Sequence, residues 1–171
     1  MNRVRGAVLL ALAAAPPLAG QPSGEAWLTL ARGYHTSPAG GAGVAGVTAG
    51  FGVGSPTLSF GPEIVLRTAD SIRVRGFGIG GRIRQRSQYL QPHLVASVGI
   101  YAWQRARAGQ GRRWDEVEYL TASLGAGASI GTWRGRLSGL VEARWHRNVA
   151  SSATDGSRSL VGVDAGLRVA W

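Results

Sequence analysis

The residues best suited to acid–base chemistry lie around position 146. Glu142 and His146 are four residues apart, an even spacing that puts both side chains on one face of a β-strand. The carboxylate could orient the imidazole, but a hydrolytic site also needs a nucleophile, which Ser151 or Ser152 would have to supply. A histidine in the interior or at the rim of a folded domain is the simpler interpretation. We therefore predict no catalytic residue.

Metal and cofactor chemistry have little support in the sequence. The chain contains no cysteine, and its three histidines, His35, His93 and His146, lie on different segments without the spacing of metal ligands. Glycine makes up 27 of the 171 residues, and two stretches match GxGxxG, but no helical pattern follows either, as dinucleotide binding requires. These stretches are Gly41, Gly43, Gly46 and Gly76, Gly78, Gly81. We predict no metal and no cofactor.

The N-terminus has the charged, apolar and small-residue order of a secretory signal peptide. Arg3 and Arg5 precede an apolar run over residues 6–15, and Pro16 and Pro17 end this run before it is long enough to cross a bilayer as a helix. The sequence therefore predicts a signal peptide at 1–20, a short N-terminal segment at 21–26 and one folded domain at 27–171.

After the signal, apolar side chains recur at every second position, which is the period of a β-strand. Tight turns alternate with longer polar connections, an asymmetry typical of bacterial outer-membrane barrels. We predict an all-β fold, an eight-stranded antiparallel up-and-down transmembrane β-barrel located in the bacterial outer membrane. The strands are expected at 27–34, 44–53, 58–68, 72–83, 89–103, 120–130, 136–147 and 161–171.

The composition of the two strand faces predicts which one meets lipid. One face is aliphatic, and the other is glycine, serine and a few charged residues, which suits the narrow interior of an eight-stranded barrel. We expect the interior charges to pair as Glu63 with Arg67, Glu142 with Arg144, and Asp164 with Arg168. Arg73 and Arg75 need a bulge or a position above the hydrocarbon. The alternative is an exported soluble, lipocalin-like barrel whose apolar face points inward to bind a small apolar ligand.

The formal charge is +10, and all 19 cationic residues are arginine. A nucleic-acid partner fits that charge but not an exported, membrane-facing chain without a helix or stacking motif. Four arginines gather in one predicted outer loop, where the phosphates of lipopolysaccharide are the nearer anions. A merely solvated loop is the alternative. The candidate lipopolysaccharide-contact residues are Arg105, Arg107, Arg112 and Arg113.

The last strand resembles the assembly signal of outer-membrane barrels, a polar-x-Gly-x-x-apolar-x-aromatic pattern. It is formed by Asp164, Gly166, Val169 and Trp171, although Trp171 stands where the family usually has phenylalanine. Residues 90–94 are similar to the Pro-Tyr-Leu stretch of small OmpA-like and OmpX-like barrels, with His93 in place of the tyrosine. The resemblance covers residues 27–171. It implies a membrane-embedded monomer inserted by the barrel assembly machinery, surrounded by outer-membrane lipid, with a structural or surface-interaction role.

A second resemblance is weaker. Outer-membrane lipid A deacylases carry a His-x-Ser-Asn pattern, and this chain has His146, Arg147 and Asn148 without the serine. We therefore expect a non-enzymatic barrel with a salt-bridged interior and no wide pore, and keep a lipid A-modifying enzyme as the lesser alternative.

Overall fold

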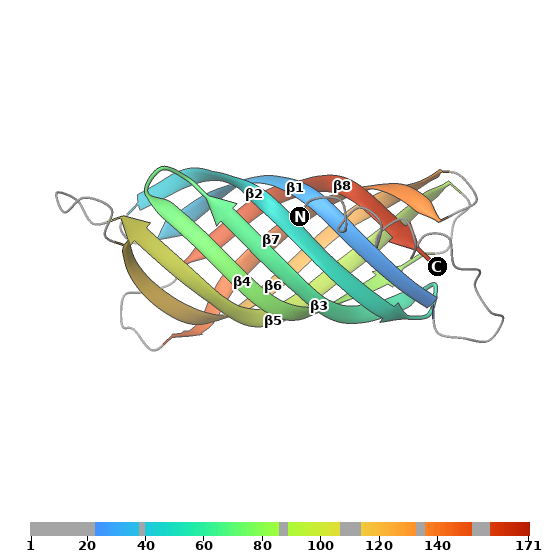
Figure 1. The fold of residues 1–171 in the computed structure, drawn as a ribbon, viewed down its shortest axis with the longest axis horizontal. Coiled ribbons are helices and arrows are strands. Elements are labelled where there is room, and N and C mark those ends of the chain that lie inside the picture. Colours follow the sequence, from blue (N-terminus) through green and yellow to red (C-terminus); the bar gives the residue numbers. More distant parts are fainter. Residues whose placement is uncertain (1–22, 38–39, 86–88, 107–113, 133–135, 152–157) are drawn as a thin grey trace, which may run out of the picture.

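The computed structural model describes residues 23–37, 40–85, 89–106, 114–132, 136–151 and 158–171, so the predicted signal peptide lies outside the described residues. Eight antiparallel strands follow one another around a closed barrel, and β8 pairs with β1 to complete it (Figure 1). The strands are β1 Ser23–Ser37, β2 Gly40–Gly54, β3 Leu58–Thr68, β4 Ile72–Arg84, β5 Leu90–Ala106, β6 Trp114–Thr132, β7 Leu137–Ser151 and β8 Ser159–Ala170. Within these residues, no helix is long and apolar enough to cross a membrane.

The predicted fold class is confirmed, and the strand boundaries differ mainly by being longer. β3 has the predicted limits, whereas β1 begins at Ser23, inside the segment expected to precede the barrel. Residues 35–43, expected as a long loop, belong to β1 and β2 apart from 38–39. Glycine, serine and threonine hide the apolar period there, but their backbones continue the ladder between Ser37 and Gly40. Strands of 11 to 19 residues meet or exceed the ~9–11 residues that a tilted crossing needs.

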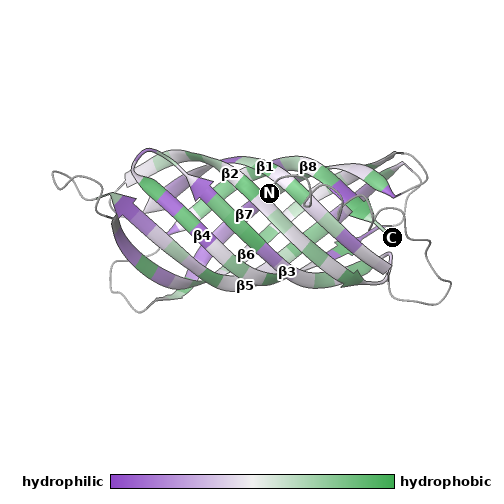
Figure 2. Ribbon diagram, viewed as in Figure 1, coloured by the Kyte–Doolittle hydropathy of each residue, from purple (hydrophilic) through white to green (hydrophobic). Residues whose placement is uncertain are grey.

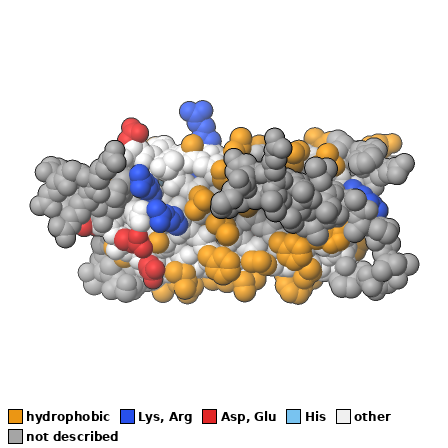
Figure 3. All heavy atoms as spheres, viewed as in Figure 1, with side chains coloured by type: hydrophobic (Ala, Val, Ile, Leu, Met, Phe, Trp, Pro, Cys, Tyr) orange, Lys and Arg blue, Asp and Glu red, His pale blue; other side chains and the backbone are white. Residues whose placement is uncertain are grey.

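The aliphatic face of the sheet points outward. Leu124 and Leu167 are 60% and 57% exposed, while Asp164 on the neighbouring parity of β8 is 1% exposed. Hydrophobic and hydrophilic residues alternate along the strands (Figure 2), and hydrophobic side chains gather over the middle of the face that Figure 3 shows. The soluble-calyx alternative is wrong for this chain, because it requires the aliphatic rows inside and the charges outside.

The barrel interior is filled by two different kinds of side chain. We call the end with the β1–β2, β3–β4, β5–β6 and β7–β8 connections the outer end, and the opposite end the inner end. Toward the outer end lies an apolar plug, and Trp103 in it contacts Tyr119 edge to face with ring centroids 6.5 Å apart. The plug consists of Val44, Val65, Val74, Tyr101, Trp103, Tyr119 and Leu160. Charged side chains occupy the middle and the inner end.

The outward arginines of β4 lie close to its outer end. Arg73 and Arg75 are both exposed within the first four residues of the strand. The register of β4 with β3 and with β5 runs without a shift, so no bulge accommodates them. The sequence allowed either a bulge or a position above the hydrocarbon for these arginines. β4 has no bulge, and the structure places both arginines near the rim.

Candidate functional site

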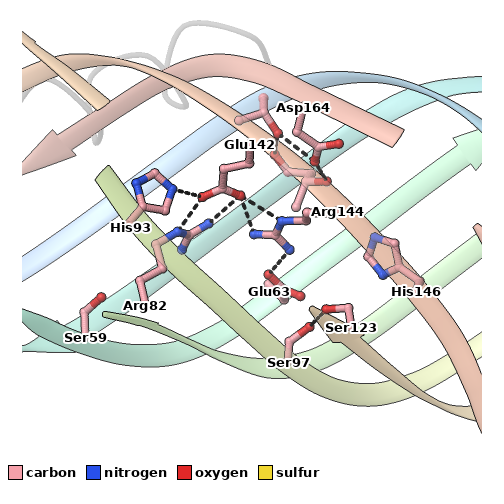
Figure 4. A network of polar contacts seen from close by, with 12 residues as sticks. Ser59, Glu63, Arg82, His93, Ser97, Ser123, Glu142, Arg144, His146 and Asp164 are labelled. Carbon is pink, nitrogen blue, oxygen red and sulfur yellow. Dashed lines mark hydrogen bonds and ion pairs between the residues drawn. The ribbon is translucent and has the colours of Figure 1, made fainter. Parts of the chain in front are cut away.

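The densest group of charges inside the barrel centres on Glu142 of β7. Arg82 Nε donates to Glu142 Oε1 at 2.7 Å, and Arg144 Nε donates to Oε2 at 2.7 Å. His93 Nε2 lies 2.9 Å from Oε1 (Figure 4). Three strands thus supply partners to one carboxylate that is 1% exposed. Such a group is tolerated in a low-dielectric interior only because nearly all of its hydrogen-bonding capacity is used.

Two further carboxylates extend this network across the barrel. Arg144 Nη1 donates to Glu63 Oε2 of β3 at 2.9 Å. Arg67 Nη2 donates to Asp164 Oδ2 of β8 at 3.0 Å, and the hydroxyl of Thr48 donates to the same oxygen at 2.6 Å. These contacts join strands that are not neighbours in the sheet, so they hold opposite walls of the barrel together.

Two of the three pairings expected from the sequence are therefore wrong. Glu142 does pair with Arg144. Glu63 pairs with Arg144 rather than Arg67, and Asp164 pairs with Arg67 rather than Arg168. Residues four apart on an extended strand are ~13 Å apart, whereas side chains from facing strands meet at the axis of a narrow barrel.

Arg168 belongs instead to a smaller charged group at the inner end. Its Nε lies 3.7 Å from Glu25 Oε2 of β1. Glu25 also receives hydrogen bonds from Arg84 and, at 2.5 Å, from the hydroxyl of Ser59. A cavity of about 300 Å³ opens beside these residues.

Four members of the interior network were not predicted from the sequence: Glu25, Arg82, Arg84 and His93. Glu25 was missed because it lies before the predicted start of the barrel. Arg82 and Arg84 share the parity of Gly76, Gly78 and Gly80, and extending that small, inward-facing row to the end of β4 would have found both. Arg82 also stacks its guanidinium over the ring of Trp27, 3.7 Å from the centroid.

His146 lies inside the barrel rather than on its lipid-facing wall. It is 2% exposed, and its Nδ1 is 3.4 Å from the hydroxyl of Tyr101. Glu142 points to Arg82, Arg144 and His93, so its carboxylate does not orient the His146 ring (Figure 4). The acyl chains of a lipid substrate meet the outer wall, which this histidine does not reach. The geometry therefore gives a lipid A-modifying reaction no support among the described residues.

The other predicted residues have the following places. In the C-terminal segment, Asp164 is in the interior network, and Trp171 exchanges backbone hydrogen bonds with Gly24 and packs its ring against Phe51. Gly166 lies so close to β1 that a Cβ there would be 2.0 Å from the Leu28 carbonyl oxygen. Arg105 is exposed at the outer end of β5. Arg107, Arg112 and Arg113 lie outside the described residues.

The interior charges contact one another rather than converging on an open site. The part of the chain that the structure describes holds no group of three or more His, Asp or Glu side chains placed to bind a metal ion. In the same part of the chain, four interior carboxylates are matched by five interior arginines: Glu25, Glu63, Glu142 and Asp164 with Arg67, Arg82, Arg84, Arg144 and Arg168.

Comparison with known proteins gives the fold. No family model matches the chain, and a search of curated protein sequences finds no match. Neisserial surface protein A has a TM-score of 0.73 and 14% identity, over 87% of this chain and 99% of that one. Ail of Yersinia pestis, in complex with the heparin analogue sucrose octasulfate, has a TM-score of 0.55 and 9% identity, over 86% and 99%. The N-terminal β-barrel domain of Pseudomonas aeruginosa OprF has a TM-score of 0.52 and 11% identity, again over 86% and 99%. All three are small eight-stranded outer-membrane barrels.

Proposed function

We propose that this chain, which has the fold of the small eight-stranded outer-membrane β-barrels, is an integral outer-membrane protein with a structural or surface-interaction role. One observation carries the proposal, namely the orientation of the two faces of the sheet. Aliphatic side chains such as Leu124, Leu167 and Ile100 point outward, and the charged residues are inside. That arrangement is stable when hydrocarbon surrounds the barrel, whereas in water it would expose a large apolar surface.

The filled interior favours a protein without a wide pore. The apolar plug closes the outer half, where Tyr101, Trp103 and Tyr119 are each 1% exposed. The ion pairs of Glu142 and Glu63 cross the middle. The cavity of about 260 Å³ at the outer end and that of about 300 Å³ at the inner end lie on opposite sides of this filling. A hydrated ion would have to displace packed rings and paired charges to pass.

The proposal extends to partners that follow from the location. Export by the signal peptide at 1–20 and recognition of the C-terminal segment ending in Trp171 by the barrel assembly machinery would bring a monomer into the membrane. The loop with Arg105, Arg107, Arg112 and Arg113 would then face lipopolysaccharide.

Cell fractionation tests the location. The full chain should follow outer membranes, require detergent for extraction and run as a faster, heat-modifiable band when it is not boiled. Recovery in the soluble periplasmic fraction would overturn the proposal. Planar-bilayer recordings test the closed interior, and we expect no steady open-channel conductance from the purified protein. Persistent conductance would mean that the barrel holds an open pore, and it would overturn the proposal of a closed interior.

A further inference from the structure

Among the described residues, four exposed arginines point away from the barrel axis: Arg147 of β7 and three that lie on β1 and β4. Arg32 of β1 and Arg73 and Arg75 of β4 are all exposed on the outward parity of their strands. The pairing registers put Arg32, Ala45, Thr68 and Arg73 side by side on four successive strands. Because adjacent strands are ~4.8 Å apart, the Cα atoms of Arg32 and Arg73 are ~14 Å apart across the wall.

Between these arginines the wall is hollowed by small side chains. One depression of about 240 Å³ is lined by Arg32, Gly43, Ala45 and Thr68, among others. A second, of about 290 Å³, is lined by Val47, Leu66, Arg73 and Arg75 and shares Ala45 and Thr68 with the first. A Cβ added to Gly43 would meet nothing within 4 Å, so the floor lies open. We call these two adjoining depressions together the wall groove, defined by Arg32, Gly43, Ala45, Val47, Leu66, Thr68, Arg73 and Arg75.

The wall groove joins an apolar surface to a basic one. Leu66 and Val47 continue into the hydrophobic band, while the arginines mark its boundary toward the outer end. Figure 3 shows both basic and acidic side chains near the end of the barrel where β4 begins. An outward arginine costs ~2–4 kcal/mol at the bilayer midplane but ~0–1 near an interface, so these residues belong at headgroup level.

The exposed carboxylates nearest the wall groove lie outside its lining. Glu116 and Glu118 of β6 are two strands away from Arg73 and Arg75 in the same rows, and Asp70 lies in the turn between β3 and β4. Gln104 of β5 donates a hydrogen bond to Glu116. The wall groove on β1–β4 has no carboxylate in its lining. Its charge therefore complements an anion whose remainder is hydrocarbon. Guanidinium groups bind phosphate oxygens through paired hydrogen bonds.

We propose that the wall groove binds the lipid A part of lipopolysaccharide. Its phosphates contact Arg32, Arg73 and Arg75, and one acyl chain lies along Val47 and Leu66. The inference rests on the proposed outer-membrane location. It differs from the contact expected of the arginine loop at 105–113, because it places the lipid on the side wall of β1–β4.

The test measures lipid A binding to the purified, detergent-folded full chain by native mass spectrometry. The triple variant Arg32→Gln/Arg73→Gln/Arg75→Gln should bind diphosphoryl lipid A at least tenfold more weakly than the unchanged chain. Arg147→Gln is the matched control, because Arg147 is an outward arginine on β7, outside the groove, beside the Trp145 ring. Arg147→Gln should change binding less than twofold. Equal losses in the triple variant and in this control would overturn the inference, because they would show general charge attraction.

A second variant keeps every charge and fills the floor. Ala45→Trp should weaken lipid A binding at least fivefold while the heat-modifiable band and circular dichroism stay unchanged. Removing one lipid phosphate, with monophosphoryl lipid A as the probe, should weaken binding to the unchanged chain. Phosphatidylglycerol that binds as tightly as lipid A would overturn the assignment. If lipid A binding is insensitive to all groove variants but the protein still fractionates with outer membranes, the inference fails and the proposed function stands.

Discussion

At the scale of single residues, the interior charges stabilise this barrel only as members of a network. Each of the four buried carboxylates has at least one arginine within 4.0 Å, and Glu142 has Arg82 and Arg144 as well as His93. Burying an ion pair gains little over an apolar pair of the same shape, but removing one member leaves a buried charge without compensation. The loss in free energy of unfolding caused by a substitution in this network should therefore grow with the number of partners that the substitution leaves unpaired.

Glu142→Gln should lower the free energy of unfolding by about 3–5 kcal/mol, because two buried guanidinium groups lose a charged acceptor. Urea unfolding in detergent, followed by tryptophan fluorescence and the heat-modifiable band, measures the change. Glu118→Gln is the control, since Glu118 is exposed on the outer wall of β6 and its loss should cost within about 0.5 kcal/mol. Similar losses for both variants would contradict a network role for Glu142.

The cross-barrel pairing of Asp164 is testable by double-mutant cycles. Arg67→Gln and Asp164→Asn should show a coupling of about 1–3 kcal/mol, because the two side chains are in direct contact at 3.0 Å. Asp164→Asn and Arg168→Gln, the pair expected from sequence spacing, should be additive within about 0.5 kcal/mol. The reverse outcome would restore the pairing along the strand.

At the scale of elements, a glycine of β8 sets how closely β8 approaches β1, whereas a glycine of β7 does not limit strand approach. A Cβ at Gly166 of β8 would lie 2.0 Å from the Leu28 carbonyl oxygen of β1, which backbone atoms cannot vacate without shifting the strand. At Gly139 of β7 a Cβ would meet nothing within 4 Å. Glycine is therefore required for close strand packing at position 166 and is not required on steric grounds at position 139.

Gly166→Ala should destabilise the barrel by more than about 1 kcal/mol, because β8 must move away from the closing strand β1. Gly139→Ala should be neutral or stabilise by about 0.4–1 kcal/mol, because alanine restricts the unfolded chain and fits the folded one. Unfolding midpoints of the two variants in the same detergent make the comparison. An equal effect at the two glycines would show that strand approach is not what Gly166 controls.

The strands were predictable because a period of two needs only local sequence. The face of each strand followed from the same pattern, since glycine and serine mark a crowded interior and leucine and valine mark the lipid side. The partners of the interior charges were not predictable, because Glu63 meets Arg144 only after strand tilt and barrel closure bring β3 and β7 together across the axis. Glu25 and Arg84 lie at strand ends, where the pattern fades and boundaries are hardest to place.

At the scale of the whole molecule, the barrel places its apolar surface outside, its paired charges inside and its aromatic plug toward one end. The outward band is interrupted by charge only toward the outer end, among the described residues, by Arg32, Arg73, Arg75, Glu116, Glu118 and Arg147. The remaining outward surface is apolar and suits the hydrocarbon core of a bilayer. The charged rim suits the headgroup region. The loss in unfolding free energy caused by a new outward charge should therefore depend on its depth along the barrel axis.

Two arginine substitutions on the outer wall test that dependence on depth. Leu124 is 60% exposed near the middle of β6, and Val149 is 58% exposed near the outer end of β7. In phospholipid vesicles, Leu124→Arg should cost about 2–4 kcal/mol of unfolding free energy and Val149→Arg about 0–1 kcal/mol. In detergent micelles, which deform around a charge, the difference between the two variants should shrink. Equal costs in vesicles would mean that Leu124 does not lie at the centre of a bilayer. Because every strand is fixed to its neighbours in one closed sheet, the membrane-spanning orientation of the whole barrel would then have to be abandoned.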